Sequence, residues 1–252
     1  MEKINPLKLA NRYIRKLEER GLIQKSPAFL YDYKKEYPQF SILERNYEVI
    51  RKECEMLLQR KEDITDMDGI AGKKTQGGIH SIAWKSFVFK SGTFIKENCE
   101  LCPETAKIVK GIPRVKQVFF SILEPHQHIK PHKGYYKGFL RYHLGVIIPN
   151  DNLDKKCWIK INDDPVDNEN YSNYSMEKHE IYHWKNGEGI IFDDYYLHEA
   201  ANESDEVRVV MFIDVLRKFP VWLDWLNVLI LKIAYQTKGV KAVAKNAKIK
   251  TA

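Results

Sequence analysis

The sequence has little cysteine. Four cysteines are spread over 252 residues, at positions Cys54, Cys99, Cys102 and Cys157. This low density excludes the disulfide-rich scaffolds of small secreted proteins. Cys99 and Cys102 have the spacing of half a zinc or redox site, but no second pair accompanies them, and Pro103 indicates that a helix starts there. We therefore expect four inert thiols.

The sequence also lacks an apolar run of the ~20 residues that a membrane-spanning helix needs. Its most apolar segment, residues 221–231, is interrupted by Asp224 and Asn227. The segment Met1–Asn5 has no apolar core of the kind found in secretory signals. We therefore expect a cytoplasmic protein in a reducing compartment.

Acidic residues are absent from the C-terminal segment. Residues 232–252 contain six lysines and no Asp or Glu, and the whole chain has a formal net charge of +7, so the remainder is nearly neutral. Tryptophans beside an apolar run, followed by lysines, favour an amphipathic helix and basic tail over residues 219–252, in peripheral contact with the inner face of an anionic membrane. A C-terminal helix docked on the domain explains the same pattern. No nucleic-acid-binding motif accompanies the lysines, so no nucleic-acid partner is expected.

Helical periodicity dominates the first part of the chain. Apolar spacing predicts helices over residues 1–26 and 41–60, and flanking Pro and Gly residues predict a third over residues 103–110. Ser41 and Glu44 have the spacing of a capping box at the start of the second helix. Residues 61–80 are polar and Gly-rich, which predicts a loop.

From residue 115 onward the chain consists of short β-rich runs separated by turn signals. We predict strands over residues 115–123, 141–148, 157–161, 181–184, 189–192 and 207–215. Many short strands at close spacing imply an antiparallel sandwich or barrel, whose mouth can hold a ligand. Helices first and strands later place the fold in the α+β class.

Two histidines and an arginine in the β-rich part indicate a chemical site. His132 lies in a Pro-His-Lys-Gly sequence, His198 in Tyr-Leu-His-Glu, and Arg208 follows. Imidazoles suit Fe(II), and open coordination positions let non-heme iron oxygenases bind an organic acid and O₂. The usual facial triad also contains a carboxylate, but the residue two positions after His132 is Gly134. The trio therefore predicts an iron site with an anchor for a dicarboxylate, but without a third protein ligand.

The stretch from about residue 80 to residue 216 resembles the aspartyl/asparaginyl β-hydroxylase family. The resemblance is carried by motifs whose spacing is kept throughout: Phe120–Pro125, Pro131–Gly134, Leu140–Gly145, Trp184–Glu188, Phe192–Asp194, His198–Glu199 and Arg208–Asp214. Bacterial hydroxylases of lipid A and of ornithine lipids are similar over the same stretch. The resemblance implies an Fe(II)- and 2-oxoglutarate-dependent dioxygenase with a double-stranded β-helix (a cupin-like jelly roll), on which N-terminal helices and a C-terminal helix pack.

The resemblance also implies roles for individual residues. It makes His132 and His198 the iron ligands, and in the protein-hydroxylase branch of the family glycine likewise occupies the carboxylate position, with water completing the metal shell. The residues assigned to 2-oxoglutarate are Arg208 and Ser121 at its distal carboxylate, Arg141 and His143 near its metal-binding end, and Trp84 beside it. Arginine suits the distal position because it stays charged and binds carboxylates through a bidentate fork. Arg141 could instead face an anionic substrate.

Other polar residues near these motifs have simpler explanations. His126 and His128 lie shortly before His132, but this spacing on a loop lacks the helical geometry of a zinc protease. We expect both at the rim of the site. Asp193 and Asp194 could be additional metal ligands, but they also precede a turn whose backbone amides they can cap.

The expected activity is insertion of one oxygen atom into an unactivated C–H bond, with Fe(II), 2-oxoglutarate and O₂. The basic tail favours a lipid or another membrane-associated substrate, whereas Gly134 favours β-hydroxylation of Asp or Asn residues in a protein or peptide. A third hypothesis is a non-catalytic cupin-like module that binds a metal. We divide the chain into an N-terminal helical region (1–80), a dioxygenase domain (81–218), and an amphipathic helix with a basic tail (219–252).

Overall fold

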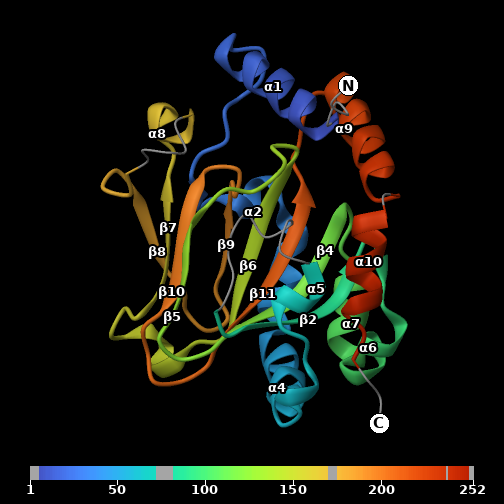
Figure 1. Ribbon diagram of the computed structural model, residues 1–252, viewed down its shortest axis with the longest axis vertical. Helices are drawn as coiled ribbons and strands as arrows, with labels where there is room; N and C mark the ends of the chain where they lie inside the picture. The colour runs from blue at the N-terminus through green and yellow to red at the C-terminus, as the bar shows by residue number, and fades with distance from the viewer. Residues whose placement is uncertain (1–5, 72–81, 170–174, 237, 250–252) are drawn as a thin grey trace.

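Two antiparallel β-sheets pack face to face at the centre of the molecule (Figure 1). The computed structural model describes residues 6–71, 82–169, 175–236 and 238–249. The larger sheet has the order β1 (Phe29–Leu30), β9 (Gly189–Phe192), β6 (Phe139–Ile147), β11 (Arg208–Leu216), β4 (Val115–Leu123), β2 (Trp84–Ser91) and β3 (Thr93–Phe94). The smaller sheet has the order β5 (Gln127–His132), β10 (Leu197–Asn202), β7 (Cys157–Asn162) and β8 (Glu180–His183).

From β4 to β11 the chain passes back and forth between the two sheets, except at β7 and β8, which form a pair within the smaller sheet. The strands β4, β6, β9 and β11 lie in the larger sheet, and β5, β7, β8 and β10 lie in the smaller one. Strands that are distant in sequence thereby become neighbours, as β4 and β11 do in the larger sheet and β5 and β10 in the smaller. This winding is the double-stranded β-helix, and the predicted α+β class and jelly roll are confirmed.

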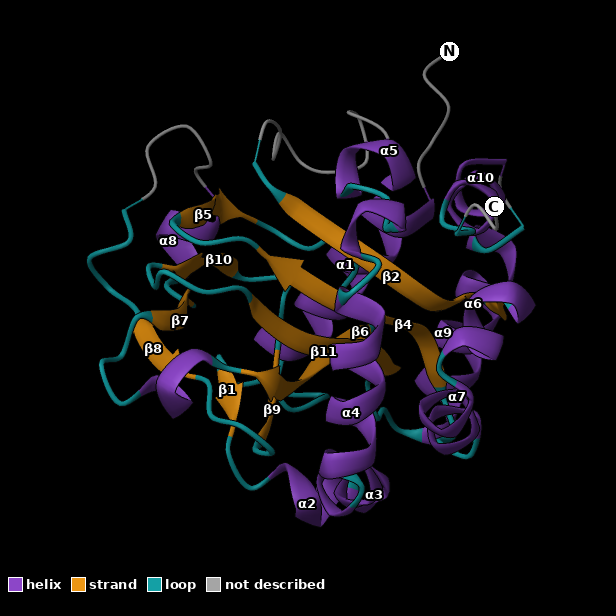
Figure 2. Cartoon of the chain, turned by 90° about the horizontal axis from the view of Figure 1, so that it is seen from below, coloured by secondary structure: helices purple, strands orange, loops and turns teal. Residues whose placement is uncertain are grey.

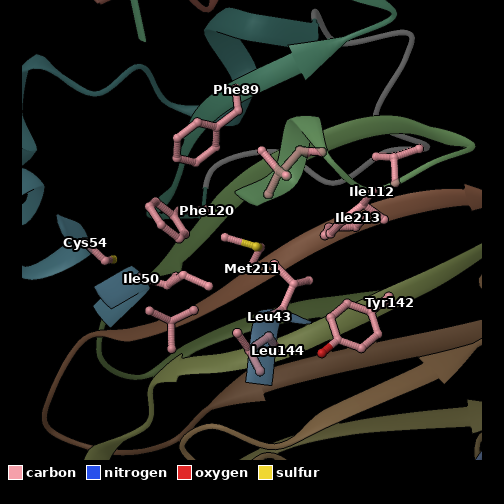
Figure 3. Packing of buried hydrophobic residues seen from close by; sticks show 14 of the residues in the cluster. Leu43, Ile50, Cys54, Phe89, Ile112, Phe120, Tyr142, Leu144, Met211 and Ile213 are labelled. Carbon is pink, nitrogen blue, oxygen red and sulfur yellow. The ribbon is translucent and has the colours of Figure 1, made fainter. Parts of the chain in front are cut away.

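Strand β11 contributes side chains to both faces of the larger sheet. All nine of its residues are buried, and its side chains alternate between the two faces. Met211 and Ile213 point outward, and Figure 3 shows them among side chains of the helical layer such as Leu43 and Ile50. Arg208 is on the opposite face, which points into the space between the sheets. The outward face is uniformly apolar, whereas the inward face carries the polar residues of the site.

Helices cover the outer face of the larger sheet. Figure 2 shows α4 across this face. The helices of this layer are α2 (Tyr33–Glu36), α3 (Ser41–Arg45), α4 (Tyr47–Leu58), α6 (Lys96–Leu101) and α7 (Pro103–Lys110). Beside β2 lie α5 (Met67–Ala71) and α10 (Lys238–Asn246). Near one end of the barrel lie α1 (Pro6–Glu19), α8 (Pro165–Glu169) and α9 (Val221–Ala234) (Figure 1). Short 3₁₀ helices occupy Pro38–Phe40, Lys61–Asp63 and Pro149–Asn152.

The N-terminal helices differ in detail from the prediction. The predicted helix over residues 1–26 ends at Glu19, because Gly21 adopts a φ of 67° and the amide of Leu22 bonds back to Leu17 O at 2.9 Å. Residues 1–5 of that prediction lie outside the described residues. The predicted helix over residues 41–60 is broken at Asn46, whose φ and ψ are −107° and 19°.

The predicted capping box is wrong. Ser41 makes no capping hydrogen bond, and the carboxylate of Glu44 instead accepts a hydrogen bond from the Tyr33 hydroxyl and pairs with Lys34. The predicted loop over residues 61–80 contains a 3₁₀ turn and α5, and its remainder, residues 72–80, lies outside the described residues. The helix over residues 103–110 is confirmed.

The strand predictions were most accurate where apolar runs are long. β4 and β9 have the predicted bounds, and β6, β7, β8 and β11 differ from theirs by one or two residues at an end. Five strands were missed: the two-residue strands β1 and β3, and the longer strands β2, β5 and β10. The structure places His128 on β5 and not on the predicted loop, so that part of the prediction is wrong.

All four cysteines are buried free thiols. Burial raises the pKa of each, most strongly for Cys54 and Cys102. This agrees with thiols of low reactivity.

Candidate active site

The two histidines that the sequence singled out face each other across neighbouring strands. His132 is the last residue of β5 and His198 the second of β10, and the two are directly paired in the antiparallel register. Their ring centroids are 4.1 Å apart. His198 is buried and His132 is half-buried, so the pair lies where the interior meets the surface.

The hydrogen bonds of both rings fix which nitrogen is free. Nδ1 of His132 lies 2.8 Å from Lys130 O, and Nδ1 of His198 lies 2.8 Å from Tyr196 O. A carbonyl only accepts, so each Nδ1 carries the proton and each Nε2 keeps its lone pair. Burial lowers the pKa of His132 to about 4 and that of His198 well below its usual value, where the neighbouring His132 contributes further. Both rings are therefore neutral near pH 7, as metal-binding imidazoles must be.

Position 134 has no room for the carboxylate of a facial triad. A Cβ atom on Gly134 would lie 2.2 Å from Oδ2 and 2.7 Å from the backbone oxygen of Asp194. The amide of Gly134 donates to that same backbone oxygen at 2.6 Å, which holds the two segments together. Among the described residues, no three His, Cys, Asp or Glu side chains gather as a metal site. The donor set present is thus two neutral imidazoles, which fits a metal that takes its remaining ligands from small molecules.

Arg141 occupies the interior next to the histidines, and carboxylates surround it. Its guanidinium lies 2.7 Å from Asp194 and 3.0 Å from Asp214, and stacks 3.9 Å from the centroid of the Phe212 ring. Its charge contributes to the low pKa of both His132 and His198. The prediction that Arg141 lies near the metal-binding end agrees with this location, but its charge is already balanced by the protein.

Arg208 is a second buried guanidinium, and its surroundings are different. Its side chain is 1% exposed, its Nε has no hydrogen-bond partner, and one Nη donates to Ser121 O at 3.4 Å. No carboxylate among the described residues forms an ion pair with it. Burial lowers the pKa of Arg208 to about 10, which still leaves it charged at neutral pH. A buried charge without a counterion costs several kcal/mol, so this position requires an anion.

More unpartnered polar atoms lie between Arg208 and the histidines. Both ring nitrogens of His143 and Nε1 of Trp184 are buried without a hydrogen bond. Trp184 stacks 4.7 Å from the Arg208 guanidinium, His143 lies 5.8 Å from Trp184, and Phe192 bridges the rings of His143 and His198 at 4.9 and 6.2 Å. A continuous line of side chains therefore joins the histidine pair to Arg208. Buried donors without partners along it are what a bound dicarboxylate would satisfy.

The remaining predicted residues, Trp84 and Ser121, belong to the Arg208 end. Nε1 of Trp84 donates to Oγ of Ser121 at 2.9 Å. The prediction missed a role for Trp184, which is fully buried, although its Trp-Lys-Asn-Gly-Glu motif had been singled out. It also missed Asp194 and Asp214 as partners of Arg141.

Other histidines and acids lie outside this line. His126 pairs with Asp205 at 2.9 Å, and His128 pairs with Glu199 at 2.7 Å, both on exposed rings. Asp193 accepts a hydrogen bond from the amide of Tyr195 at 3.0 Å, so its expected capping role is confirmed. Asp194 faces Gly134 and Arg141 instead.

Comparison with protein families identifies the chain. The model of the aspartyl/asparaginyl beta-hydroxylase family matches residues 44–218, which includes every residue of the line from His132 to Arg208. The chain belongs to this family. The resemblance predicted from the sequence motifs is thus confirmed, and membership of this family makes the chain a hydroxylase.

Two curated relatives represent different branches of the hydroxylases. The ornithine lipid ester-linked acyl 2-hydroxylase of Rhizobium tropici is 32% identical over 213 residues, which cover 84% of this chain and 69% of that protein. The human aspartyl/asparaginyl beta-hydroxylase is 25% identical over 69% of this chain, but the match spans only 20% of the human protein. Among solved structures, a Pseudomonas putida prolyl-4-hydroxylase has a TM-score of 0.42 at 11% identity, covering 69% of this chain and 88% of that one.

Proposed function

We propose that this hydroxylase uses Fe(II), 2-oxoglutarate and O₂ to insert one oxygen atom into an unactivated C–H bond of a lipid. The observation that carries the proposal is Arg208, a buried guanidinium without a carboxylate partner, at the far end of a line of unpartnered donors that begins at two neutral imidazoles. A small dianion that also binds a metal meets the needs of both ends.

Each residue then has a defined task. Nε2 of His132 and of His198 would hold the metal, and the backbone carbonyls of Lys130 and Tyr196 keep the rings in the required tautomer. Arg208, with Ser121 and Trp84, would hold the distal carboxylate, and His143 and Arg141 would line its metal-binding end. When bound, iron and 2-oxoglutarate supply the oxidising chemistry with O₂. The protein orients the diacid and keeps water away from it.

The function is tested by His198→Ala, assayed for succinate formation from 2-oxoglutarate. We expect no metal-dependent succinate formation, because one of two protein ligands is lost. Turnover at the wild-type rate would refute the metal assignment. An anaerobic Fe(II) titration of the wild-type protein, with and without 2-oxoglutarate, separates an enzyme from a non-catalytic metal-binding module: only the enzyme is expected to show an absorption band that depends on 2-oxoglutarate.

Support for a lipid substrate comes from the relative that acts on ornithine lipid and from the surface around α9. Six large apolar side chains of α9 are exposed: Val221, Trp222, Trp225, Val228, Leu229 and Ile233. The adjoining α1 exposes Leu9 and Tyr13 together with Lys8, Arg12 and Lys16. Tryptophans beside cations favour an anionic membrane surface. Among the described residues no helix is long and apolar enough to span a bilayer, so we propose peripheral contact, on the inner face of the membrane.

Vesicle flotation tests this contact. The double variant Trp222→Ala/Trp225→Ala is expected to lose most of its binding to phosphatidylglycerol vesicles, since each tryptophan contributes buried apolar area at the interface. Leu153→Ala, at a residue 79% exposed on the 3₁₀ turn after β6, is the matched control and should bind as wild type does. Undiminished binding of the tryptophan variant would contradict the docking role. Oxygenation of an Asp- or Asn-containing peptide, with no lipid product, would favour the protein-hydroxylase alternative.

A further inference from the structure

A charged hollow of about 200 Å³ is lined in part by residues that flank the two histidines in sequence, Lys133 and Tyr196. Its walls come from α1, from the turn after β5, from residues 163–169 and from the segment before β10. In Figure 1 these parts gather at the end of the barrel where α1 and α8 lie. We call it the α1 hollow.

The α1 hollow is joined to the active site through the backbone. Lys133, in its wall, directly follows His132. Tyr196, also in its wall, accepts the hydrogen bond from Nδ1 of His198. The hollow and the active site therefore share the two chain segments that carry the imidazoles.

Most of the cations in this wall are already neutralised by the protein. Lys137, 2% exposed, lies 3.1 Å from Glu18 and 3.6 Å from Asp193. Arg15 lies 3.2 Å from Glu169 and 3.6 Å from Glu19. These groups shape the hollow but have no charge to offer a ligand.

Lys133 is the exception. Its Nζ donates to the backbone oxygen of Asn168 at 2.7 Å and lies 4.9 Å from the centroid of the Tyr195 ring. No carboxylate among the described residues forms an ion pair with it. The side chain thus has capacity for one anionic group.

The hollow also contains a carboxylate that is only loosely held. Asp163 lies 3.8 Å from Nζ of Lys25, and both side chains are about half exposed. Pairs of this length and exposure contribute little free energy, so a ligand can replace Lys25 at small cost. The wall as a whole has four basic and four acidic residues, which does not favour a polyanion.

We propose that the α1 hollow binds the headgroup of the substrate, and that this headgroup is zwitterionic, with a carboxylate on Lys133 and an ammonium near Asp163. The inference rests on the proposed function, because it places the acyl chain of a lipid toward His132 and His198. It assigns the choice of substrate to residues outside the metal and 2-oxoglutarate sites.

Three soluble probes separate the two charges: N-hexanoyl-ornithine carries both, N-hexanoyl-norvaline carries only the carboxylate, and N-hexanoyl-putrescine carries only the ammonium. Their dissociation constants are measured by calorimetry on the intact protein without metal or 2-oxoglutarate. We expect the ornithine probe to bind about tenfold more tightly than the norvaline probe or the putrescine probe, which is the size of one charge-assisted hydrogen bond.

Two variants make the assignment specific. Lys133→Gln should weaken the ornithine and norvaline probes about tenfold and leave the putrescine probe unchanged. Asp163→Asn should weaken the ornithine and putrescine probes about threefold and leave the norvaline probe unchanged, because its carboxylate is more exposed. Lys178→Gln is the matched control: Lys178 is 76% exposed, pairs with Asp164 and lies outside the hollow, so no probe should be affected.

Equal affinity of the wild-type protein for all three probes would overturn the proposal. So would a Lys133→Gln substitution that lowers the affinity for all three probes by the same factor. The measurement needs no turnover, so its outcome is independent of the oxygenase chemistry. Probe binding without succinate formation would contradict the proposed function alone. Succinate formation with a lipid but without charge-selective binding would contradict the headgroup site alone.

Discussion

Two arginines lie between the sheets, Arg208 1% exposed and the side chain of Arg141 12% exposed, and their partners differ. Arg141 is held by Asp194 at 2.7 Å and Asp214 at 3.0 Å. Arg208 has a long hydrogen bond to a carbonyl and an aromatic ring beside it, and its Nε has no partner. Burial by itself therefore does not distinguish a structural arginine from one that binds a ligand.

The difference lies in where the counterion comes from. The charge of Arg141 is balanced by carboxylates of the chain, so these ion pairs can stabilise the junction of β6, β11 and the turn before β10 without any ligand. The Arg208 site is incomplete, and its charge is balanced only when an anion enters. The same residue type thus forms ion pairs within the chain at one place in the interior, and under the proposed function it would bind the diacid at the other.

The largest expected effect on the free energy of unfolding comes from replacing Arg141, whose charge is balanced by two carboxylates of the chain. Arg141→Met should reduce the free energy of unfolding by about 3–5 kcal/mol, because it leaves two buried carboxylates without a cation. Urea unfolding followed by circular dichroism measures the change. Arg51→Met is the matched control, since Arg51 pairs with Glu55 on the surface of α4, and its loss should cost less than about 1 kcal/mol. A loss at Arg141 no larger than at Arg51 would mean that the two buried carboxylates do not need the guanidinium.

The same substitution at Arg208 should give a different result. Arg208→Met should leave the ligand-free stability unchanged or raise it, because it removes a buried charge that no protein group balances. Saturating 2-oxoglutarate should stabilise the wild-type protein by about 2.7 kcal/mol at a concentration one hundred times its dissociation constant, and the variant not at all. Thermal unfolding of the metal-loaded protein with and without the diacid measures both effects. If ligand-free Arg208→Met is as destabilised as Arg141→Met, the contrast between the two arginines is wrong.

A milder change sharpens the role of Arg208. Arg208→Lys keeps the charge but loses the planar fork that matches a carboxylate. We expect the KM for 2-oxoglutarate to rise about tenfold, corresponding to roughly 1.4 kcal/mol, with a smaller change in kcat. Initial rates of succinate formation over a range of 2-oxoglutarate concentrations measure it. An unchanged KM would place the distal carboxylate elsewhere.

The apolar strands could be predicted from the sequence, whereas the strands with many polar residues could not. β4 and β9 are rich in Val, Ile and Phe, and their bounds were predicted from composition. β5 and β10 have no such pattern, because polar residues occupy part of their inward faces. Their sequences are Gln-His-Ile-Lys-Pro-His and Leu-His-Glu-Ala-Ala-Asn. Their strand structure comes from pairing with each other and with β7, which is tertiary information.

The site shows the same division. His132, His198 and Arg208 were identified from motifs and their resemblance to a family. The partners of Arg141 could not be, because Asp214 comes opposite Arg141 only through the register of β6 with β11. The sequence showed that position 134 has a glycine where the facial triad has a carboxylate. It could not show that a side chain there would collide with Asp194, sixty residues away in sequence.

Substitution of Gly134 tests why a third protein ligand is missing. Gly134→Asp supplies the carboxylate of the usual facial triad, yet its Cβ would lie 2.2 Å from Oδ2 of Asp194 and 2.7 Å from a backbone oxygen that the Gly134 amide already binds. We expect a loss of about 1–3 kcal/mol in the free energy of unfolding and no gain in Fe(II) affinity, because the turn after His132 must shift. Gly134→Ala carries the same Cβ without the charge and should lose a similar amount, whereas Gly111→Ala, whose nearest contact would be 3.3 Å, should lose less. Tighter Fe(II) binding by Gly134→Asp at wild-type stability would show that the position accepts a ligand after all, and that Asp194 yields to it.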